Sequence, residues 1–148
     1  MDNRTASDPL VLIEEESLSV LVLRDGTELY RSHDQGVKPL VELVDWFPGG
    51  IEGATVADRI VGACAARIFA HLRVGRVLGL AGSVPAESVL HAAGIDYAFR
   101  RTVAEIRNRT DTGICPFELL SAQHRATPAL IVGIRQRLAE FSGGRTCD

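Results

Sequence analysis

The sequence predicts an α/β fold, namely a three-layer α/β/α sandwich with a mixed sheet. Short runs rich in Val and Leu alternate with helical stretches along most of the chain. Single strands separated by helices favour a partly parallel sheet covered by helices on both faces. The 148 residues are 46% hydrophobic and 24% charged, which is typical of one globular domain with its own core. We expect this single domain over 10–141, with flexible tails at 1–9 and 142–148.

Turn and cap residues define the first elements. Residues 10–13, followed by three glutamates, predict a short helix. Asp25-Gly26 lies between two apolar runs, so we expect a β-hairpin over 18–32. A helix is predicted from Gly36 to about Phe47, because it has a proline in its first turn and apolar residues at three- and four-residue spacing.

A long buried helix is predicted over 55–73. Thr55 and Asp58 fit a capping box at its start, and Gly75 follows its end. Its centre, residues 62–66, consists of small residues. This pattern is typical of a buried helix that packs closely on a sheet.

The C-terminal half alternates between strands and helices. Residues 76–81 and 95–100 predict two strands, with a helix over 85–93 between them. Pro116 predicts the first turn of a helix that ends near Gln123, and a last helix begins at Thr127-Pro128.

Composition and motifs exclude several classes of function. The net charge of −3 argues against a dedicated nucleic-acid-binding protein. No apolar stretch reaches 18 residues, so we expect no membrane span. The four histidines lack the spacing of metal ligands, and no glycine-rich phosphate or dinucleotide motif occurs, so no metal or cofactor is expected. The three cysteines are few, odd in number and far apart, which predicts a reducing, cytoplasmic compartment.

The segment 108–118 is the first candidate for chemistry. It places polar groups, a glycine and Cys115 directly before a helix, with Cys115 as N-cap, Pro116 at N1 and Glu118 at N3. The helix dipole would lower the pKa of the Cys115 thiol and make it a candidate nucleophile. The alternative is a buried structural cysteine, since free cysteine is among the most buried residue types.

Two helix starts offer further binding groups. Asp58 is a candidate acid or base, and could orient a ligand together with Arg59; the alternative is a cap and an ordinary ion pair. Ser83 opens a helix after a strand, where backbone N–H groups can hold a phosphate; the alternative is an ordinary N-cap.

A local basic cluster comes before helix 116–123. Arg109 belongs to it, together with Arg100, Arg101 and Arg107. These side chains could form an anion pocket beside the helix N-terminus; the alternative is a solvated surface.

The order and spacing of several motifs resemble a family of unknown function in the cytidine-deaminase-like superfamily. The resemblance covers about residues 15–125. It is carried by Arg24-Asp25-Gly26, Gly36-Val37-Lys38-Pro39-Leu40, Ala57-Asp58-Arg59-Ile60-Val61-Gly62 and Asn108-Arg109 through Glu118. It implies a sandwich with a mixed sheet and a pocket at the N-termini of two helices. The residues that the resemblance implies for this pocket are Asp58, Arg59 and Ser83, together with Lys38, Cys115 and Glu118.

Zinc deaminases of this superfamily use a His or Cys plus a Glu on the helix after the hairpin, and they add P-C-x-x-C at the start of the next helix. The chain departs at both places, which read Val56-Ala57-Asp58-Arg59 and Gly82-Ser83-Val84-Pro85-Ala86-Glu87. The resemblance therefore implies a deaminase-fold protein without the zinc ligand set. We expect it to bind a small anionic, nucleotide-like ligand, with cysteine-dependent chemistry at Cys115 and Asp58. The alternative is a non-catalytic protein- or RNA-binding module. The sequence does not determine the oligomeric state, and it allows a homo-oligomer.

Overall fold

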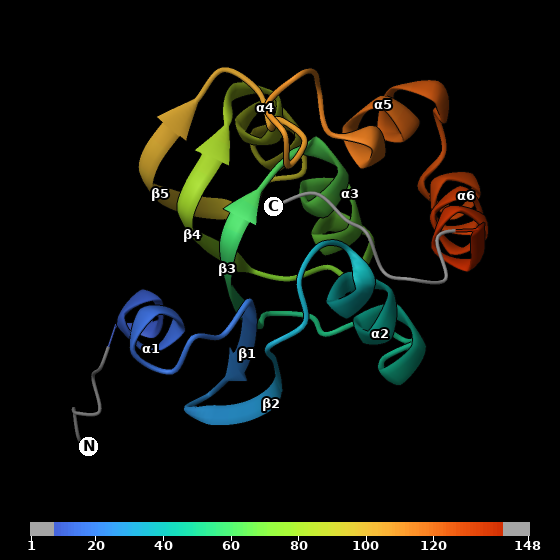
Figure 1. Cartoon of the computed structure of the whole chain (residues 1–148). Helices are drawn as coiled ribbons and strands as arrows, with labels where there is room; N and C mark the ends of the chain where they lie inside the picture. Colours follow the sequence, from blue (N-terminus) through green and yellow to red (C-terminus); the bar gives the residue numbers. More distant parts are fainter. Residues whose placement is uncertain (1–7, 141–148) are drawn as a thin grey trace.

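One mixed sheet of five strands is the centre of the part that the structure describes, residues 8–140 of this computed structural model. The order across the sheet is β2-β1-β3-β4-β5. β1 (Val20–Arg24) is antiparallel to both β2 (Thr27–Ser32) and β3 (Thr55–Val61). β4 (Arg76–Ser83) and β5 (Asp96–Val103) run parallel to β3, as Figure 1 shows. The expected tails lie outside the described residues, except for Asp8 and Pro9.

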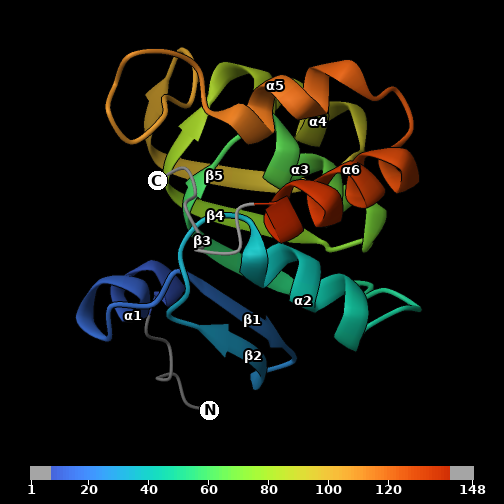
Figure 2. The ribbon, with the colours of Figure 1, turned by 45° about the vertical axis from the view of Figure 1, so that its right-hand side comes forward.

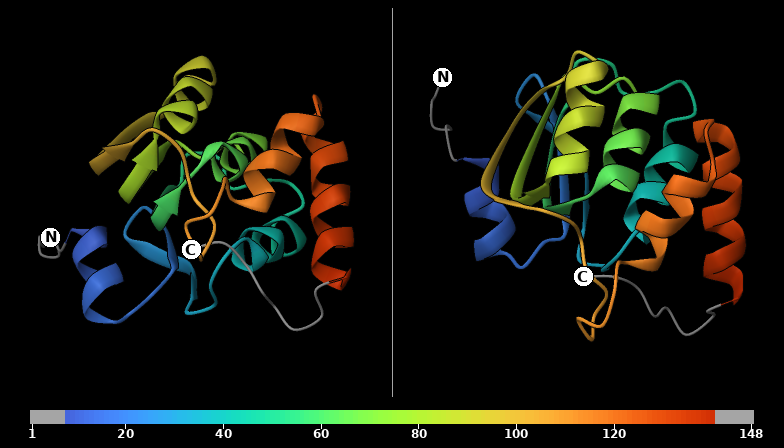
Figure 3. Two further views of the ribbon diagram at one scale, coloured as in Figure 1. Left: turned by 45° about the horizontal axis from the view of Figure 1, so that its top comes forward. Right: turned by 90° about the horizontal axis from the view of Figure 1, so that it is seen from above.

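Helices cover both faces of this sheet, but unequally. Within residues 8–140 there are six: α1 (Pro9–Glu15), α2 (Lys38–Trp46), α3 (Ala63–His71), α4 (Val84–Ala92), α5 (Pro116–Gln123) and α6 (Thr127–Glu140). Only α1 lies on one side of the sheet, while the others lie on the opposite side (Figure 2 and Figure 3). α5 and α6 pack against α3. None of these helices is long and apolar enough to cross a membrane.

Two apolar clusters on opposite faces of the sheet hold the layers together. Under α1, the strand residues Leu21, Ala57 and Leu78 pack with Ile13 and Leu18. The larger cluster consists of the strand side chains that face the other way and the apolar side chains of the other helices. Phe69 and Phe117 are among its largest fully buried side chains. Burial of apolar side chains on both faces is the main stabilising contribution in a sheet of this kind.

The predicted hairpin over 18–32 is confirmed. Asp25 and Gly26 join β1 to β2, and both have positive φ angles, 51° and 80°. Two consecutive residues with positive φ define the tight turn that matches the twist of antiparallel strands. The helices expected near 10–13, 36–47, 85–93, 116–123 and after 127 are present, as are the two strands that begin near 76 and 95.

The prediction of one helix over 55–73 is wrong. Thr55–Val61 forms β3, the central strand, and the helix begins only at Ala63. The run is rich in β-branched residues, which suit a strand whose two faces are both covered. Asp58 is therefore not part of a capping box. Gly62, with extended backbone, separates strand from helix.

Because residues 55–61 form a strand and not a helix, a site can form at the carboxyl end of β3. The carboxyl end of β3 lies beside the start of β1, where Val20 pairs with Asp58. The start of β1 in turn lies beside the end of β2, where Val20 pairs with Ser32. The connections that enter β1, leave β2 and leave β3 therefore converge at one edge of the sheet. Ligands of open α/β sheets bind outside the carboxyl ends of parallel strands.

Candidate functional site

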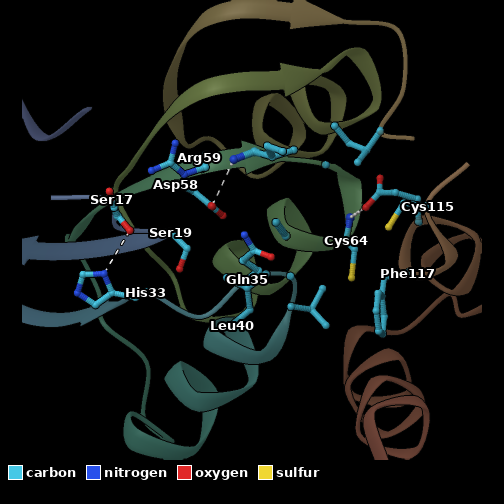
Figure 4. A pocket seen from close by; sticks show the side chains of 17 residues that line it. Ser17, Ser19, His33, Gln35, Leu40, Asp58, Arg59, Cys64, Cys115 and Phe117 are labelled. Carbon is cyan, nitrogen blue, oxygen red and sulfur yellow. Dashed lines mark hydrogen bonds between the residues drawn. The ribbon is translucent and has the colours of Figure 1, made fainter. Parts of the chain in front are cut away.

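A pocket of about 390 Å³ opens at this edge of the sheet (Figure 4). Five segments distant in the sequence contribute its walls. Its lining consists of Ser17, Ser19, His33, Gln35, Gly36, Val37, Leu40, Asp58, Arg59, Ile60, Gly62, Cys64, Ala65, Ile106, Cys115, Phe117 and Glu118. Leu40 of α2 and Phe117 of α5 make the walls apolar, while polar groups converge from β3, from Glu118 of α5 and from the connections around β1 and β2.

Successive residues of β3 face opposite sides of the sheet, and this separates the roles of Asp58 and Arg59. Asp58 is 7% exposed, and its Oδ1 accepts a hydrogen bond of 3.4 Å from the backbone N–H of Ile60. The guanidinium of Arg59 points toward α1, where its Nη2 donates to the carbonyls of Leu18 (2.9 Å) and Ile13 (3.0 Å). Arg59 thus anchors the α1–β1 connection, which forms one wall of the pocket.

The carboxylate of Glu118 caps the N-terminus of α3 from another element. Its Oε1 accepts from the backbone N–H of Ala63 (2.8 Å) and its Oε2 from that of Cys64 (3.1 Å). A carboxylate is stabilised there by the helix dipole and by two N–H groups that have no partner within the helix. Burial is the largest influence on Glu118 and raises its pKa, while the two backbone hydrogen bonds lower it.

Gly62 gives the Glu118 carboxylate room to reach α3. A Cβ at position 62 would lie 2.6 Å from Cδ and from Oε2 of Glu118. The backbone of Gly62 has φ −101° and ψ −177°, which any residue can adopt. The glycine is therefore required by the close approach and not by its backbone conformation.

Two cysteines contribute to the apolar side of the pocket. Cys64 has a free thiol, and its sulfur points toward Phe117 in Figure 4. Burial raises the pKa of the Cys64 thiol to about 12, and the nearby Glu118 carboxylate adds to the rise. Cys115 is 3% exposed and is the N-cap of α5, as predicted, but its sulfur is disulfide-bonded in the structure.

α3 and α5 are joined by a second polar contact one turn further along. Nη1 of Arg67 donates to the carbonyl of Ser121 (2.6 Å), and its Nη2 to the carbonyl of Arg125 (3.0 Å). A cation suits the C-terminal end of a helix. Arg67 of α3 binds the C-terminal end of α5, and Glu118 of α5 binds the N-terminus of α3. Together the two side chains fix α5 as one wall of the pocket.

Polar groups form the rim of the pocket. Nδ1 of His33 lies 3.2 Å from the carbonyl oxygen of Ser17. Beside it, Oε1 of Gln35 accepts a hydrogen bond of 2.7 Å from Nη2 of Arg109. Both His33 and Gln35 are exposed, so the rim is accessible from solvent.

The structure brings four of the predicted site residues together and separates the others. Asp58, Arg59, Cys115 and Glu118 line one pocket. Arg109 reaches only its rim, through Gln35.

Lys38 and Ser83 lie outside the pocket lining. The Lys38 side chain is 61% exposed, with Nζ 3.8 Å from the Asp34 carboxylate. Ser83 is fully buried at the start of α4, and its Oγ accepts from the N–H of Ala86 at 3.1 Å. Ser83 therefore has the ordinary N-cap geometry that the sequence also allowed.

Two of the four arginines in the basic cluster, Arg100 and Arg107, are paired with carboxylates. Arg100 pairs with Glu14 at 2.8 Å and with Asp8 at 3.7 Å. Arg107 pairs with Glu105 at 2.6 Å and with Asp111 at 2.9 Å. These pairs reduce the positive charge that Arg100 and Arg107 offer to an RNA backbone.

Sequence reasoning missed the pocket residues on the two N-terminal connections and at the start of α3. These are Ser17, Ser19, His33, Gln35, Gly62 and Cys64. A signal was present for the last two, because Gly62 follows a β-branched run and marks the strand-to-helix junction.

The donor groups of the pocket do not fit a zinc ion. Among residues 8–140, no group of three or more His, Cys, Asp and Glu side chains is placed to hold a metal. Catalytic zinc sites use three protein ligands and an open position.

Comparison with known proteins shows what the chain is similar to. Residues 10–138 match the model of a family described as TM1506, a domain of unknown function (DUF1893). A crystal structure of a DUF1893 family protein (TM1506) from Thermotoga maritima superposes with a TM-score of 0.80 and 24% sequence identity. The match covers 93% of this chain and 92% of that chain, and at this identity it shows the fold alone. A comparison with curated proteins found no match.

Proposed function

Because the chain belongs to the DUF1893 family of domains of unknown function, its function has to be argued from the pocket, and we propose that it binds a small, nucleotide-like ligand there. The observation that carries the proposal is the convergence of two carboxylates and apolar walls in one cavity of about 390 Å³. Small-molecule sites are typically concave, largely apolar and of roughly 300–1,000 Å³, with a few converging polar groups.

Charge favours one orientation of the ligand. Asp58 and Glu118 place two carboxylates inside the pocket, and the Glu118 carboxylate already takes the N-terminus of α3. An anionic group of the ligand is repelled there and belongs at the rim, near the exposed imidazole of His33. The inner half of the ligand is then a flat, hydrogen-bond-donating group, which suits a nucleobase.

The resemblance to the cytidine-deaminase-like superfamily supports the same place. Once β3 is recognised as a strand, the helix after the hairpin is α2 and the next one is α3. Both N-termini line the pocket, through Gly36 and Val37 for α2 and through Gly62 and Cys64 for α3. The start of α3 reads Ala63-Cys64-Ala65-Ala66-Arg67, with one cysteine where P-C-x-x-C has two.

Cysteine-dependent chemistry is not part of this proposal. The sulfur of Cys115 is disulfide-bonded, and the high pKa of the Cys64 thiol leaves little thiolate near neutral pH. The pocket supports binding, with Asp58 as the acceptor for donor groups of the ligand.

We expect Asp58→Asn to weaken nucleotide binding by about tenfold to a hundredfold, because a hydrogen bond to a charged group contributes roughly 1.5–3 kcal/mol. The measurement is calorimetric titration of the wild type and the variant with AMP, GMP, CMP and UMP. Each monophosphate is compared with its nucleoside, and the monophosphate should bind more tightly if its anionic group contacts the rim.

Asp96→Asn is the matched control, because Asp96 is exposed at the start of β5, away from the pocket. It should leave every affinity unchanged. Equal affinity of Asp58→Asn and wild type, or no binding of any of the eight compounds at millimolar concentration, contradicts the proposal.

A further inference from the structure

We infer that residues 104–114, the connection between β5 and α5, form a lid over the pocket, and that the hydrogen bond between Arg109 and Gln35 is its latch. We call this segment the strap. It lies beside the carboxyl end of β3 in Figure 1 and in the left view of Figure 3. That the strap covers a bound ligand rests on the proposed function, but the test below needs no ligand.

The base of the strap borders the pocket. Ile106 within the strap and Cys115 directly after it both line the pocket and are buried. The backbone N–H of Cys115 donates to the carbonyl of Ile106 at 3.0 Å, which closes the base of the strap. A movement of the strap about this base therefore changes access to the pocket.

Beyond its base the strap is a small, self-contained unit. Arg107 and Ile114 form an antiparallel bridge, and the N–H of Asn108 donates to the carbonyl of Gly113 at 2.9 Å. Oδ1 of Asn108 accepts from the N–H of Thr112 at 3.0 Å. These bonds are internal to the strap, so they are kept when the strap moves as one body.

The latch joins the tip of the strap to the opposite rim. Nη2 of Arg109 donates to Oε1 of Gln35 over 2.7 Å, between residues 74 positions apart in the sequence. Both side chains are exposed, and Gln35 lines the pocket mouth between β2 and α2. An exposed hydrogen bond of this kind is weak, so it can break and form on the timescale of ligand exchange.

Cys64 provides a readout of opening. Its free thiol is buried in the pocket, and a small neutral reagent must pass the mouth to reach it. The measurement is the rate at which iodoacetamide alkylates Cys64 at pH 8.5, quantified on the Cys64 peptide by mass spectrometry. The Cys64 sulfur displaces iodide from the reagent, and the peptide readout separates Cys64 from the other cysteines.

Removing and strengthening the latch should move this rate in opposite directions. Gln35→Ala breaks the bond, and we expect about threefold faster alkylation. Gln35→Glu gives Arg109 a carboxylate partner, and we expect about threefold slower alkylation. A loss of global stability could only raise the rate, so the slower variant excludes that explanation.

Two controls complete the test. Gln35→Glu combined with Arg109→Ala should lose the slowing; if the slowing persists, the new charge acts on the thiol and the latch is overturned. Gln136→Ala, an exposed glutamine on α6, should match the wild type. Rates within 1.5-fold of wild type for both Gln35 variants overturn the lid. Lid behaviour without nucleotide binding overturns only the proposed function, and nucleotide binding without lid behaviour overturns only the lid.

Discussion

Glu118→Ala is expected to lower the free energy of unfolding by about 1–2 kcal/mol at pH 7. The substitution removes the two hydrogen bonds that the carboxylate accepts from Ala63 and Cys64 and leaves the first turn of α3 uncapped. Water entering the pocket recovers part of the loss. Urea unfolding measures the change, with Glu52→Ala, an exposed loop carboxylate, as a control that stays within about 0.5 kcal/mol of wild type.

The loss of stability caused by Glu118→Ala is expected to decrease as the pH rises. Burial raises the pKa of Glu118 in the folded protein above its ordinary value of 4.5. The folded state therefore binds the proton more tightly than the unfolded state. The proton-linked part of the Glu118 contribution is fully present below pH 4.5 and is lost as the pH rises through the raised pKa. The hydrogen bonds to Ala63 and Cys64 account for the cost of the substitution that remains at pH 7. The difference between wild type and Glu118→Ala should shrink over that range, and a difference that grows with pH contradicts a buried carboxyl.

Gly62→Ala is expected to destabilise the protein by about 1–2 kcal/mol, although alanine suits the backbone angles at this position. The new methyl group would overlap the Glu118 carboxylate and force it off the end of α3. The unfolding free energy from urea titration measures this effect. Gly49→Ala is the matched control, because a Cβ at Gly49 meets nothing within 4 Å.

The double variant distinguishes this mechanism from a simple backbone effect. In the Glu118→Ala background the clash is absent, and Gly62→Ala should then stabilise by about 0.5 kcal/mol through the unfolded state. Such a change of sign corresponds to a coupling energy between the two positions. Equal costs of Gly62→Ala in both backgrounds would show that Glu118 is not what the methyl group meets.

Much of the fold follows from local signals. Asp25-Gly26 identifies the hairpin, and Pro116 identifies the start of α5, because both residue types act through their own backbone. The run from Thr55 to Val61 was ambiguous, since an apolar stretch with a polar start fits a capped helix as well as a strand. Pairing with β1 and β4 on both sides settles it as the central strand, and that pairing is non-local.

The candidate site was predictable only in part for the same reason. Asp58 and Cys115 were identified from local cap patterns, and both line the pocket, but Asp58 does so from a strand. The role of Glu118 depends on a contact 55 residues away, with the N–H of Ala63, which no local pattern contains. His33 and Gln35 reach the mouth only because β2 ends beside β1.

Native mass spectrometry of the freshly purified protein, prepared without chelator, tests the central claim of a ligand-binding pocket most directly. The account predicts an adduct of nucleotide size on the wild type, either co-purified or after addition of the four monophosphates, and its loss in Asp58→Asn. A chain that stays bare with every monophosphate, or an adduct that Asp58→Asn retains in full, would contradict the pocket as the ligand site.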